Sequence, residues 1–408
     1  MNENVSSCPS CLGNRFSSLI DFGRVPLSGA FLPAPDSTHV QIPLSFEYCE
    51  QCALIRQNWQ RDLPPHNYVH IPRATARQLP AYTREIARSL RRSGLAPGDL
   101  VIEIGANDGA FLDMLSEEGH TNLLGVEPSS SCVQINQAKG HHIEEACLDV
   151  ALANSIRSTH GPASAVICRH TLEHVTDPIG FIEAMRLLLR PGGLLFIEVP
   201  GSNTVIHDLF GHELWDEHLH LFSPNNLAAL VVRLGFSITR LAVWPLRSTS
   251  NILLWAYHEP SAAANVPRAM SFSADLMACA TFKSRWQTYA GMLHQELKLL
   301  PGPVAAIGAS HPQSNFLLFT ELGDTVSALI DDDPVKVDKY VPLPKLVPVL
   351  ASEQFLRQSS VRTVLLTAFG YESWMEKLMA PLIAHNVHVI KPYELRFLSP
   401  VRYGPMSL

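Results

Sequence analysis

The sequence has few charged residues and no long apolar run. Lys, Arg, Asp and Glu make up 17% of its 408 residues, and the formal net charge is -7. This composition gives no general attraction to nucleic-acid phosphates or anionic membranes. No run approaches the roughly 20 apolar residues that cross a bilayer, and the first residues lack the basic start and apolar stretch of a signal peptide. We therefore expect a cytoplasmic protein without a nucleic-acid or membrane partner.

Cysteine is scarce as well, with eight residues, too few for a disulfide scaffold in a chain of this length. Four of them form two CxxC pairs: Cys8 with Cys11, and Cys49 with Cys52. This spacing lets two thiolates from each tight turn reach one tetrahedral zinc ion, and four thiolates leave no position for water or substrate. We therefore expect a structural zinc in a module over residues 1–75 whose fold depends on the metal. The alternative is four unligated thiols.

A glycine turn after a predicted strand indicates a ligand site. Residues 100–104, LVIEI, predict a buried strand, and the turn GANDG that follows leads into a helix. Gly105 and Gly109 allow the backbone to pass close to a bound molecule, and the helix offers free amide donors at its N-terminus. The turn differs from GxGxxG, so a dinucleotide is not the first choice. A second strand ends at Glu127, placed to accept both hydroxyls of a ribose, with a solvated strand end as the alternative.

Strands and helices continue to alternate up to residue 200. A strand is expected over 164–168, a helix over 178–189 and another strand over 194–199. This alternation predicts a doubly wound parallel sheet, whose ligands lie beyond the carboxyl ends of the strands. Residues Asn107 and His170, like the acid after the second strand, fall at such ends.

These pieces, in their order, resemble the successive motifs of class I S-adenosylmethionine-dependent methyltransferases. The EIGANDG turn, the acid after the second strand and the passage HTLEHVTDP…LLRPGGLLFIEVP carry the resemblance over about residues 80–240. It implies an α/β fold with a Rossmann-like core over residues 76–258 and S-adenosylmethionine as cofactor. The residues it implies for cofactor binding are Glu103, Gly105, Asn107, Asp108, Gly109, Glu127, Pro128 and His170.

Histidines and acids crowd residues 207–224. A histidine held beside a carboxylate can act as a general base, and methyl transfer to a carbon or hydroxyl acceptor needs a group that takes a proton. A structural hydrogen-bonding role is the alternative for each histidine. A second metal at His218 and His220 lacks a third ligand, so a general base is the preferred interpretation. The catalytic candidates are His218, Glu217, His220 and His174.

The two CxxC pairs, the methyltransferase motifs, the EHL…FSP segment and the tail together resemble C-methyltransferases of nucleotide-linked keto-deoxysugars. The resemblance implies that Glu217 and His218 match the family's Glu-His pair, whose histidine removes the proton next to a keto group. The chain departs from the family at Trp215 and Leu221, where tyrosines are usual, and at 247–251, where a glycine-rich turn is expected. A non-sugar natural-product acceptor methylated at carbon, oxygen or nitrogen is one alternative, and a non-catalytic assembly protein that binds the cofactor is the other.

The tail predicts a helical connector and a second Rossmann-like α/β domain. Residues 262–300 are expected to be mainly helical. A stripe at roughly helical spacing is expected to serve packing, and its members are Met277, Phe282, Trp286, Tyr289 and Leu293. A strand with a glycine turn is expected at 304–310, and further strands are expected at 326–330 and 361–367. The resemblance implies that residues 259–408 hold the acceptor, a nucleotide sugar or another natural-product intermediate. The oligomeric state stays open, with a monomer favoured.

Overall fold

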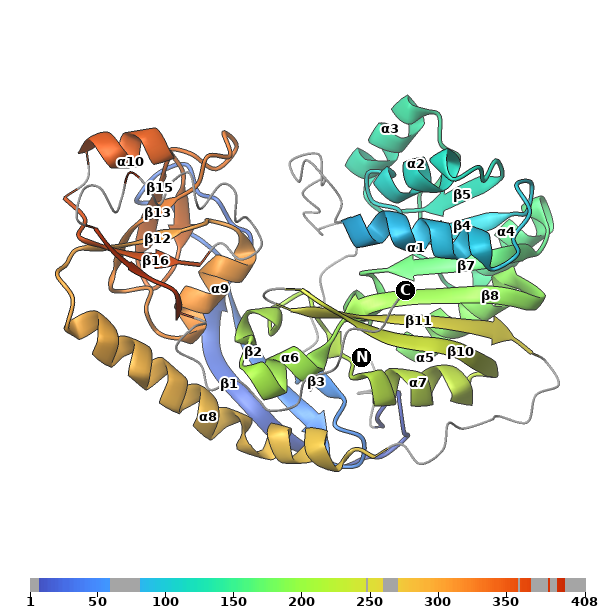
Figure 1. The fold of residues 1–408 in the computed structure, drawn as a ribbon, viewed down its shortest axis with the longest axis horizontal. Helices are drawn as coiled ribbons and strands as arrows, with labels where there is room; N and C mark the ends of the chain where they lie inside the picture. Colours follow the sequence, from blue (N-terminus) through green and yellow to red (C-terminus); the bar gives the residue numbers. More distant parts are fainter. Residues whose placement is uncertain are drawn as a thin grey trace.

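The structure is a computed structural model in which three β-sheets lie side by side. The described residues are 7–58, 81–246, 249–259, 271–358, 360–367, 381 and 387–392. Figure 1 shows a seven-stranded sheet at one end of the molecule, a six-stranded sheet at the other and a four-stranded sheet between them. Among the described residues, no helix combines the length and apolar character needed to cross a membrane.

The seven-stranded sheet has the order β10-β11-β8-β7-β4-β5-β6. Its strands are β4 (Val101–Ile104), β5 (Leu123–Val126), β6 (Ile143–Glu144), β7 (Ala163–Arg169), β8 (Leu189–Pro200), β10 (Phe236–Pro245) and β11 (Ser250–His258). Neighbours from β6 to β8 pair in parallel, whereas β11 is antiparallel to both β8 and β10. Every residue of β4 and β7 is buried, as expected for central strands with both faces covered.

Helices cover both faces of this sheet. They are α1 (Ala81–Arg92), α2 (Ala110–Glu117), α3 (Ser130–Lys139), α4 (Val150–His160), α5 (Pro178–Leu188) and α7 (Pro224–Arg233). Apolar residues of α1 and α2 share one core with Val101, and those of α4, α5 and α7 share another with Ile102. Because strand residues alternate between the two cores, β4 has apolar residues on both faces, with the buried Glu103 as its one charged residue.

The six-stranded sheet has the order β14-β15-β13-β12-β16-β17, with β14 antiparallel to β15 and the other pairs parallel. Its strands are β12 (Val304–Ile307), β13 (Val326–Ile330), β14 (Tyr340–Pro342), β15 (Leu346–Leu350), β16 (Thr363–Leu366) and β17 (His388–Ile390). Its helices are α9 (His311–Phe319) and α10 (Ser352–Gln358). The sequence predicted β12, β13 and β16. It missed β14 and β15 because prolines interrupt both of them.

The long helix α8 (Ser273–Lys298) connects the two larger sheets along one side of the molecule (Figure 1). Three aromatic residues of the predicted stripe, Phe282, Trp286 and Tyr289, are buried. Met277, predicted to belong to the same stripe, is 68% exposed, so that assignment is wrong. The buried side chains nearest to it in α8 are those of Asp275 and Ala278.

The four-stranded sheet joins the N-terminus to the histidine-rich segment. Its order is β1-β2-β3-β9, from β1 (Phe16–Pro26), β2 (Gln41–Cys49), β3 (Ile55–Gln57) and β9 (His220–Leu221). Leu19, Leu44 and Phe46 of this sheet share a core with Phe282 and Trp286 of α8. The first 75 residues thus have no separate core among their described parts, and the rest of the chain completes their packing.

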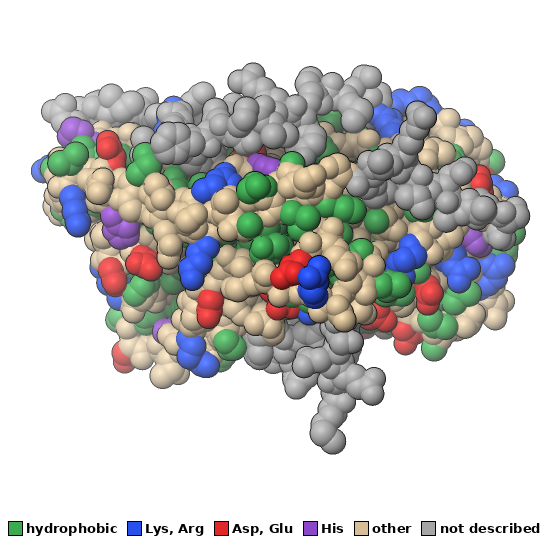
Figure 2. Space-filling model, turned by 90° about the horizontal axis from the view of Figure 1, so that it is seen from below, with side chains coloured by type: hydrophobic (Ala, Val, Ile, Leu, Met, Phe, Trp, Pro, Cys, Tyr) green, Lys and Arg blue, Asp and Glu red, His purple; other side chains and the backbone are tan. Residues whose placement is uncertain are grey.

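Figure 2 shows one face of the molecule. On that face, the described Lys and Arg side chains are interspersed with Asp and Glu side chains, and neither sign forms a continuous field (Figure 2). This distribution agrees with the modest net charge of -7 for the whole sequence.

Candidate active site

The turn between β4 and α2 has an uncommon backbone conformation. Gly105, Asn107 and Gly109 have φ values of 75°, 49° and 75°. This left-handed region is open to glycine and tolerated by asparagine. A Cβ at Gly105 would overlap Thr171 Oγ1, and one at Gly109 would overlap Asn136 Oδ1. The two glycines therefore let the turn pack tightly between the segment after β7 and helix α3.

Glu127 follows β5 and lies directly beside this turn. Its side chain is buried, and its carboxylate accepts hydrogen bonds of 2.9 Å from the backbone amides of Asn107 and Ser129. Burial raises the pKa of Glu127, and these two hydrogen bonds offset part of the rise. Each carboxylate oxygen keeps a further lone pair, so Glu127 can also accept hydrogen bonds from ligand hydroxyls.

The other cofactor candidates have different surroundings. Glu103 is buried within β4, and Pro128 is partly buried after Glu127. The Asp108 carboxylate accepts a hydrogen bond of 3.2 Å from the Ala110 amide, so it bonds to the first turn of α2. The structure therefore brings the turn and Glu127 together, whereas the cofactor candidate at position 170 lies in a separate polar network.

That network lies at the ends of β7 and β8. Arg169 Nε donates to Glu198 Oε2 at 2.7 Å, and Asn251 Nδ2 donates to Glu198 Oε1 at 2.7 Å. His170 has its Nε2 atom 3.4 Å from Glu198 Oε1 and its Nδ1 atom 3.7 Å from Glu173 Oε1. Burial disfavours the charged imidazole, but the two carboxylates outweigh burial and raise the pKa of His170.

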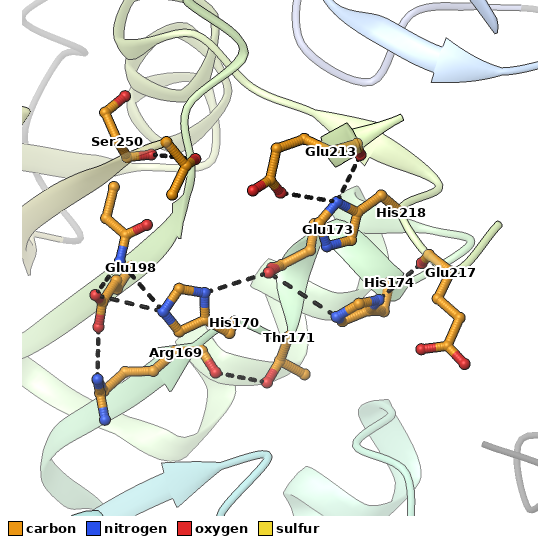
Figure 3. Close-up of polar contacts among 12 residues, drawn as sticks. Arg169, His170, Thr171, Glu173, His174, Glu198, Glu213, Glu217, His218 and Ser250 are labelled. Atoms are coloured by element: carbon orange, nitrogen blue, oxygen red, sulfur yellow. Dashed lines mark hydrogen bonds and ion pairs between the residues drawn. The ribbon is translucent and has the colours of Figure 1, made fainter. Parts of the chain in front are cut away.

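The imidazoles of His174 and His218 lie beside the Glu173 carboxylate (Figure 3), with one donor atom of each of the three residues within 4.8 Å of the others. The Nδ1 atom of His174 lies 2.7 Å from the Glu217 carbonyl oxygen, and that of His218 lies 2.9 Å from the Glu213 carbonyl oxygen. A carbonyl only accepts hydrogen bonds, so each Nδ1 carries the proton. In the neutral form of each ring, the Nε2 atom is therefore the acceptor.

Burial and the neighbouring His174 hold the pKa of His218 well below its usual range, so the ring is neutral at neutral pH. The Glu213 carboxylate lies 3.6 Å from the Nδ1 atom of His218, and burial raises the pKa of Glu213 to about 7. A neutral, oriented imidazole with an open Nε2 lone pair has the properties of a proton acceptor.

Two catalytic candidates have other surroundings. Glu217 contributes its carbonyl, and in Figure 3 its carboxylate points away from His218. The acid beside His218 is Glu213. The sequence analysis missed it because Glu213 lies five positions earlier and only the turn between the two residues brings them together. His220 lies in β9 opposite Arg56, and burial together with that arginine lowers the pKa of His220 to about 4.

The region of the six-stranded sheet contacts this cluster directly. His311, the first residue of α9, stacks on Trp215 with ring centroids 4.1 Å apart and an interplanar angle of 16°. Trp215 in turn meets the rings of His174 and His218 edge-on. The tryptophan that replaces the expected tyrosine therefore forms the contact between two parts of the chain.

The four cysteines of the two CxxC pairs also come together. Their sulfur atoms all lie within 4.8 Å of one another, with Cys8 to Cys52 and Cys11 to Cys49 at 3.5 Å each. Zinc–sulfur bonds of about 2.3 Å would hold the sulfurs of a tetrahedral site about 3.8 Å apart. The same short contacts lower the pKa of Cys49 and raise those of Cys8 and Cys52, so one thiolate is shared among these sulfurs unless a cation stabilises the others. The geometry fits a four-thiolate zinc ion.

Comparison with known proteins defines the class of the central domain. Residues 75–241 match the family model described as "Methyltransferase domain". The chain therefore carries a domain of the S-adenosylmethionine-dependent methyltransferase class, as the sequence predicted. The α/β Rossmann-like fold predicted for this part is also confirmed, with the parallel strands and antiparallel β11 described above.

Individual relatives cover less of the chain. C-methyltransferase NovU from Streptomyces niveus is 25% identical over 238 residues, which are 57% of this chain and 56% of the relative. The ubiquinone biosynthesis O-methyltransferase of Paracidovorax citrulli is 29% identical over 118 residues, 27% of this chain and 48% of the relative. The chain thus spans about half the length of these relatives. A crystal structure of magnesium protoporphyrin IX methyltransferase from Synechocystis PCC 6803 is 18% identical, with a TM-score of 0.34 over 44% of this chain and 78% of that one.

Proposed function

We propose that the protein transfers a methyl group from S-adenosylmethionine to a carbon atom of a nucleotide-linked keto-deoxysugar. The observation that carries the proposal is the neutral imidazole of His218, which a hydrogen bond to a backbone carbonyl holds in one orientation. This ring belongs to a polar cluster whose segments, like the turn beside Glu127, follow strands of the seven-stranded sheet. Carbon methylation is also the activity named for the relative NovU. The sugar acceptor rests on the resemblance of the CxxC pairs, the EHL segment and the tail.

The cofactor lies across the turn from Gly105 to Gly109 in this proposal. Glu127 accepts hydrogen bonds from the ribose hydroxyls, and the buried Glu103 and the turn residue Asp108 line the methionine part. Hydrogen bonds to a charged group contribute about 1.5–3 kcal/mol each, so Glu127 supplies a large share of the affinity. S-adenosylmethionine, when bound, supplies the electrophilic methyl group.

His218 then takes the proton from the acceptor carbon next to the keto group. Its Nε2 atom accepts this proton, while the hydrogen bond from Nδ1 to the Glu213 carbonyl keeps the ring oriented. The deprotonated carbon forms the new bond to the methyl group, and the carbon–sulfur bond of the cofactor breaks. Trp215 and His311 lie over this cluster, so the C-terminal part, residues 259–408, helps to enclose the acceptor.

The four cysteines hold a structural zinc ion in this proposal. Their mutual distances suit four sulfur ligands, and the segment between them has no separate core. Removing the metal should expose residues 1–75 to protease, with fragments identified by mass spectrometry. Full protease resistance of a metal-free sample would contradict this role.

The proposed reaction can be tested with S-adenosylmethionine that carries a deuterated methyl group. The protein is incubated with a panel of nucleotide-linked keto sugars, and fragmentation of the product in the mass spectrometer locates the label. We expect the label on a carbon next to the keto group. A label on oxygen or nitrogen would refute carbon methylation.

A second candidate function is methylation of a non-sugar acceptor. Trp215 and Leu221 stand at positions where the sugar enzymes that this chain resembles usually have tyrosines. The stack of His311 on Trp215 therefore places aromatic rings where the sugar enzymes would offer a hydroxyl group. Products from extracts of a producing cell would distinguish this candidate from the sugar enzyme. A third, a non-catalytic protein that binds the cofactor, predicts no labelled product in any extract.

A further inference from the structure

The Glu173 carboxylate is buried and has only long ion-pair contacts to imidazoles among the described residues. The residue is 2% exposed, and among the described residues neither carboxylate oxygen has a hydrogen-bond partner. The nearest imidazole nitrogens, His170 Nδ1 and His174 Nε2, lie 3.7 Å and 3.9 Å from Oε1, too far for a hydrogen bond. The His170 ion pair compensates part of the cost of burying this carboxylate without hydrogen-bond donors, and a further cation beside Glu173 would compensate more of it.

Two imidazole lone pairs lie beside this carboxylate. The Nδ1 protons of His174 and His218 are held by backbone carbonyls, which leaves both Nε2 atoms as electron-pair donors. Histidines that bind metals generally donate the other ring N–H to a carbonyl or carboxylate in this way. The outer hydrogen bonds of a metal site are therefore already formed.

Backbone contacts fix the two segments that supply these side chains. The 3₁₀ turn η3 (Leu172–His174) follows β7 and carries Glu173 and His174. The Leu219 amide donates to the Glu173 carbonyl oxygen at 2.8 Å, next to the hydrogen bond from His174 to the Glu217 carbonyl. The cluster is thus held by main-chain bonds between parts of the chain that are distant in sequence.

We propose that Glu173, His174 and His218 form a binding site for one divalent transition-metal ion of the zinc type. Two neutral imidazoles and one carboxylate are a ligand set that zinc accepts while keeping a fourth position open. The three donor atoms lie within 4.8 Å of one another, whereas a tetrahedral zinc site holds such atoms about 3.3 Å apart. In the proposed site, side-chain rotations bring the three donor atoms to this spacing when the ion binds.

The metal site also has a consequence for catalysis, and this consequence rests on the proposed function. The Nε2 atom of His218 that takes the acceptor proton is the same atom that binds the ion. Metal and proton therefore exclude one another at this nitrogen, and the bound ion inhibits proton removal.

The test counts metal in the full-length protein. The protein is dialysed against zinc chloride, and bound zinc is measured by plasma mass spectrometry. We expect Glu173→Gln and His174→Asn each to bind one equivalent fewer than the wild type. Asparagine keeps a donor for the Glu217 carbonyl but removes the Nε2 ligand. Glu217→Gln, in the same cluster but with a carboxylate that points away, should keep the wild-type count.

The comparison between variants makes the result independent of the cysteine site, which contributes equally to all of them. Calorimetric titration with S-adenosylhomocysteine checks that each variant is folded. If neither the wild type nor any variant bound this cofactor product, the proposed function would be refuted, but the metal count would still test the metal site. Equal zinc content in the wild type, Glu173→Gln and His174→Asn would overturn the metal site.

Discussion

Replacing Glu127 by glutamine should weaken cofactor binding without unfolding the domain. The carboxylate accepts one backbone hydrogen bond on each oxygen, from Asn107 and from Ser129. Glutamine keeps one accepting oxygen, but its amide group faces the other backbone donor and the negative charge is lost. A lost charge-assisted bond to a ribose hydroxyl costs about 1.5–3 kcal/mol, which raises the Kd by about 10- to 150-fold.

The pH dependence of binding gives this prediction a second readout. The charged form of Glu127 is the stronger acceptor for hydroxyl groups, so affinity falls as pH drops through the pKa of this carboxyl. Because burial raises that pKa, the fall begins at a higher pH than for an ordinary glutamate. The glutamine variant has no such carboxyl and should lose this part of the pH dependence.

Isothermal titration calorimetry with S-adenosylhomocysteine measures both effects. Glu144→Gln is the matched control, since Glu144 ends the neighbouring strand β6 and its side chain is 43% exposed. We expect its Kd to equal that of the wild type. An unchanged Kd for a folded Glu127→Gln protein would refute the assignment of the ribose to this acid.

Three further predictions concern catalysis and stability. His218→Asn should reduce methyl transfer by about 10²- to 10⁴-fold, because the proton acceptor is removed, while the calorimetric Kd of the cofactor product stays unchanged; equal turnover rates would remove His218 from the mechanism. Glu198→Gln should lower the free energy of unfolding by about 3–5 kcal/mol, because Arg169 is left buried without its charged partner, and denaturant unfolding with no shift of the midpoint would contradict this. Gly105→Ala should lower the melting temperature more than Gly94→Ala, since both positions have positive φ but only Gly105 has a neighbouring side chain in the way. Equal melting temperatures would show that the close approach at Gly105 is unimportant.

The central sheet was largely predictable because local sequence determines it. The three apolar residues of β4, the glycines after it and the acid after β5 each have a local physical reason, namely burial on two faces, positive φ and a strand end. The order of these pieces along the chain then specified the class of domain. No contact between distant residues was needed for that step.

The acceptor side was less predictable because distant segments build it. Glu213 lies beside His218 only through the turn that joins them, and sequence adjacency had favoured Glu217 instead. Glu173 joins the cluster from the segment after β7, and His311 arrives from α9. Such contacts have no periodic pattern in the sequence that would reveal them.

The same limit explains the N-terminal region. The sequence analysis predicted no strand there, whereas β1 and β2 pair across two register shifts and share a core with α8. Strand β9, of two residues, is too short to be recognised from its sequence. It nevertheless places His220 in the four-stranded sheet.

A crystal structure of the protein with S-adenosylhomocysteine would test the central claim most directly, because it places the cofactor and the histidine cluster in one experiment. We predict electron density along Gly105 to Gly109, with the ribose hydroxyls on Glu127 and the sulfur atom facing the cluster of His174 and His218. Density for the cofactor in another part of the protein, or a sulfur atom facing away from these histidines, would contradict the account.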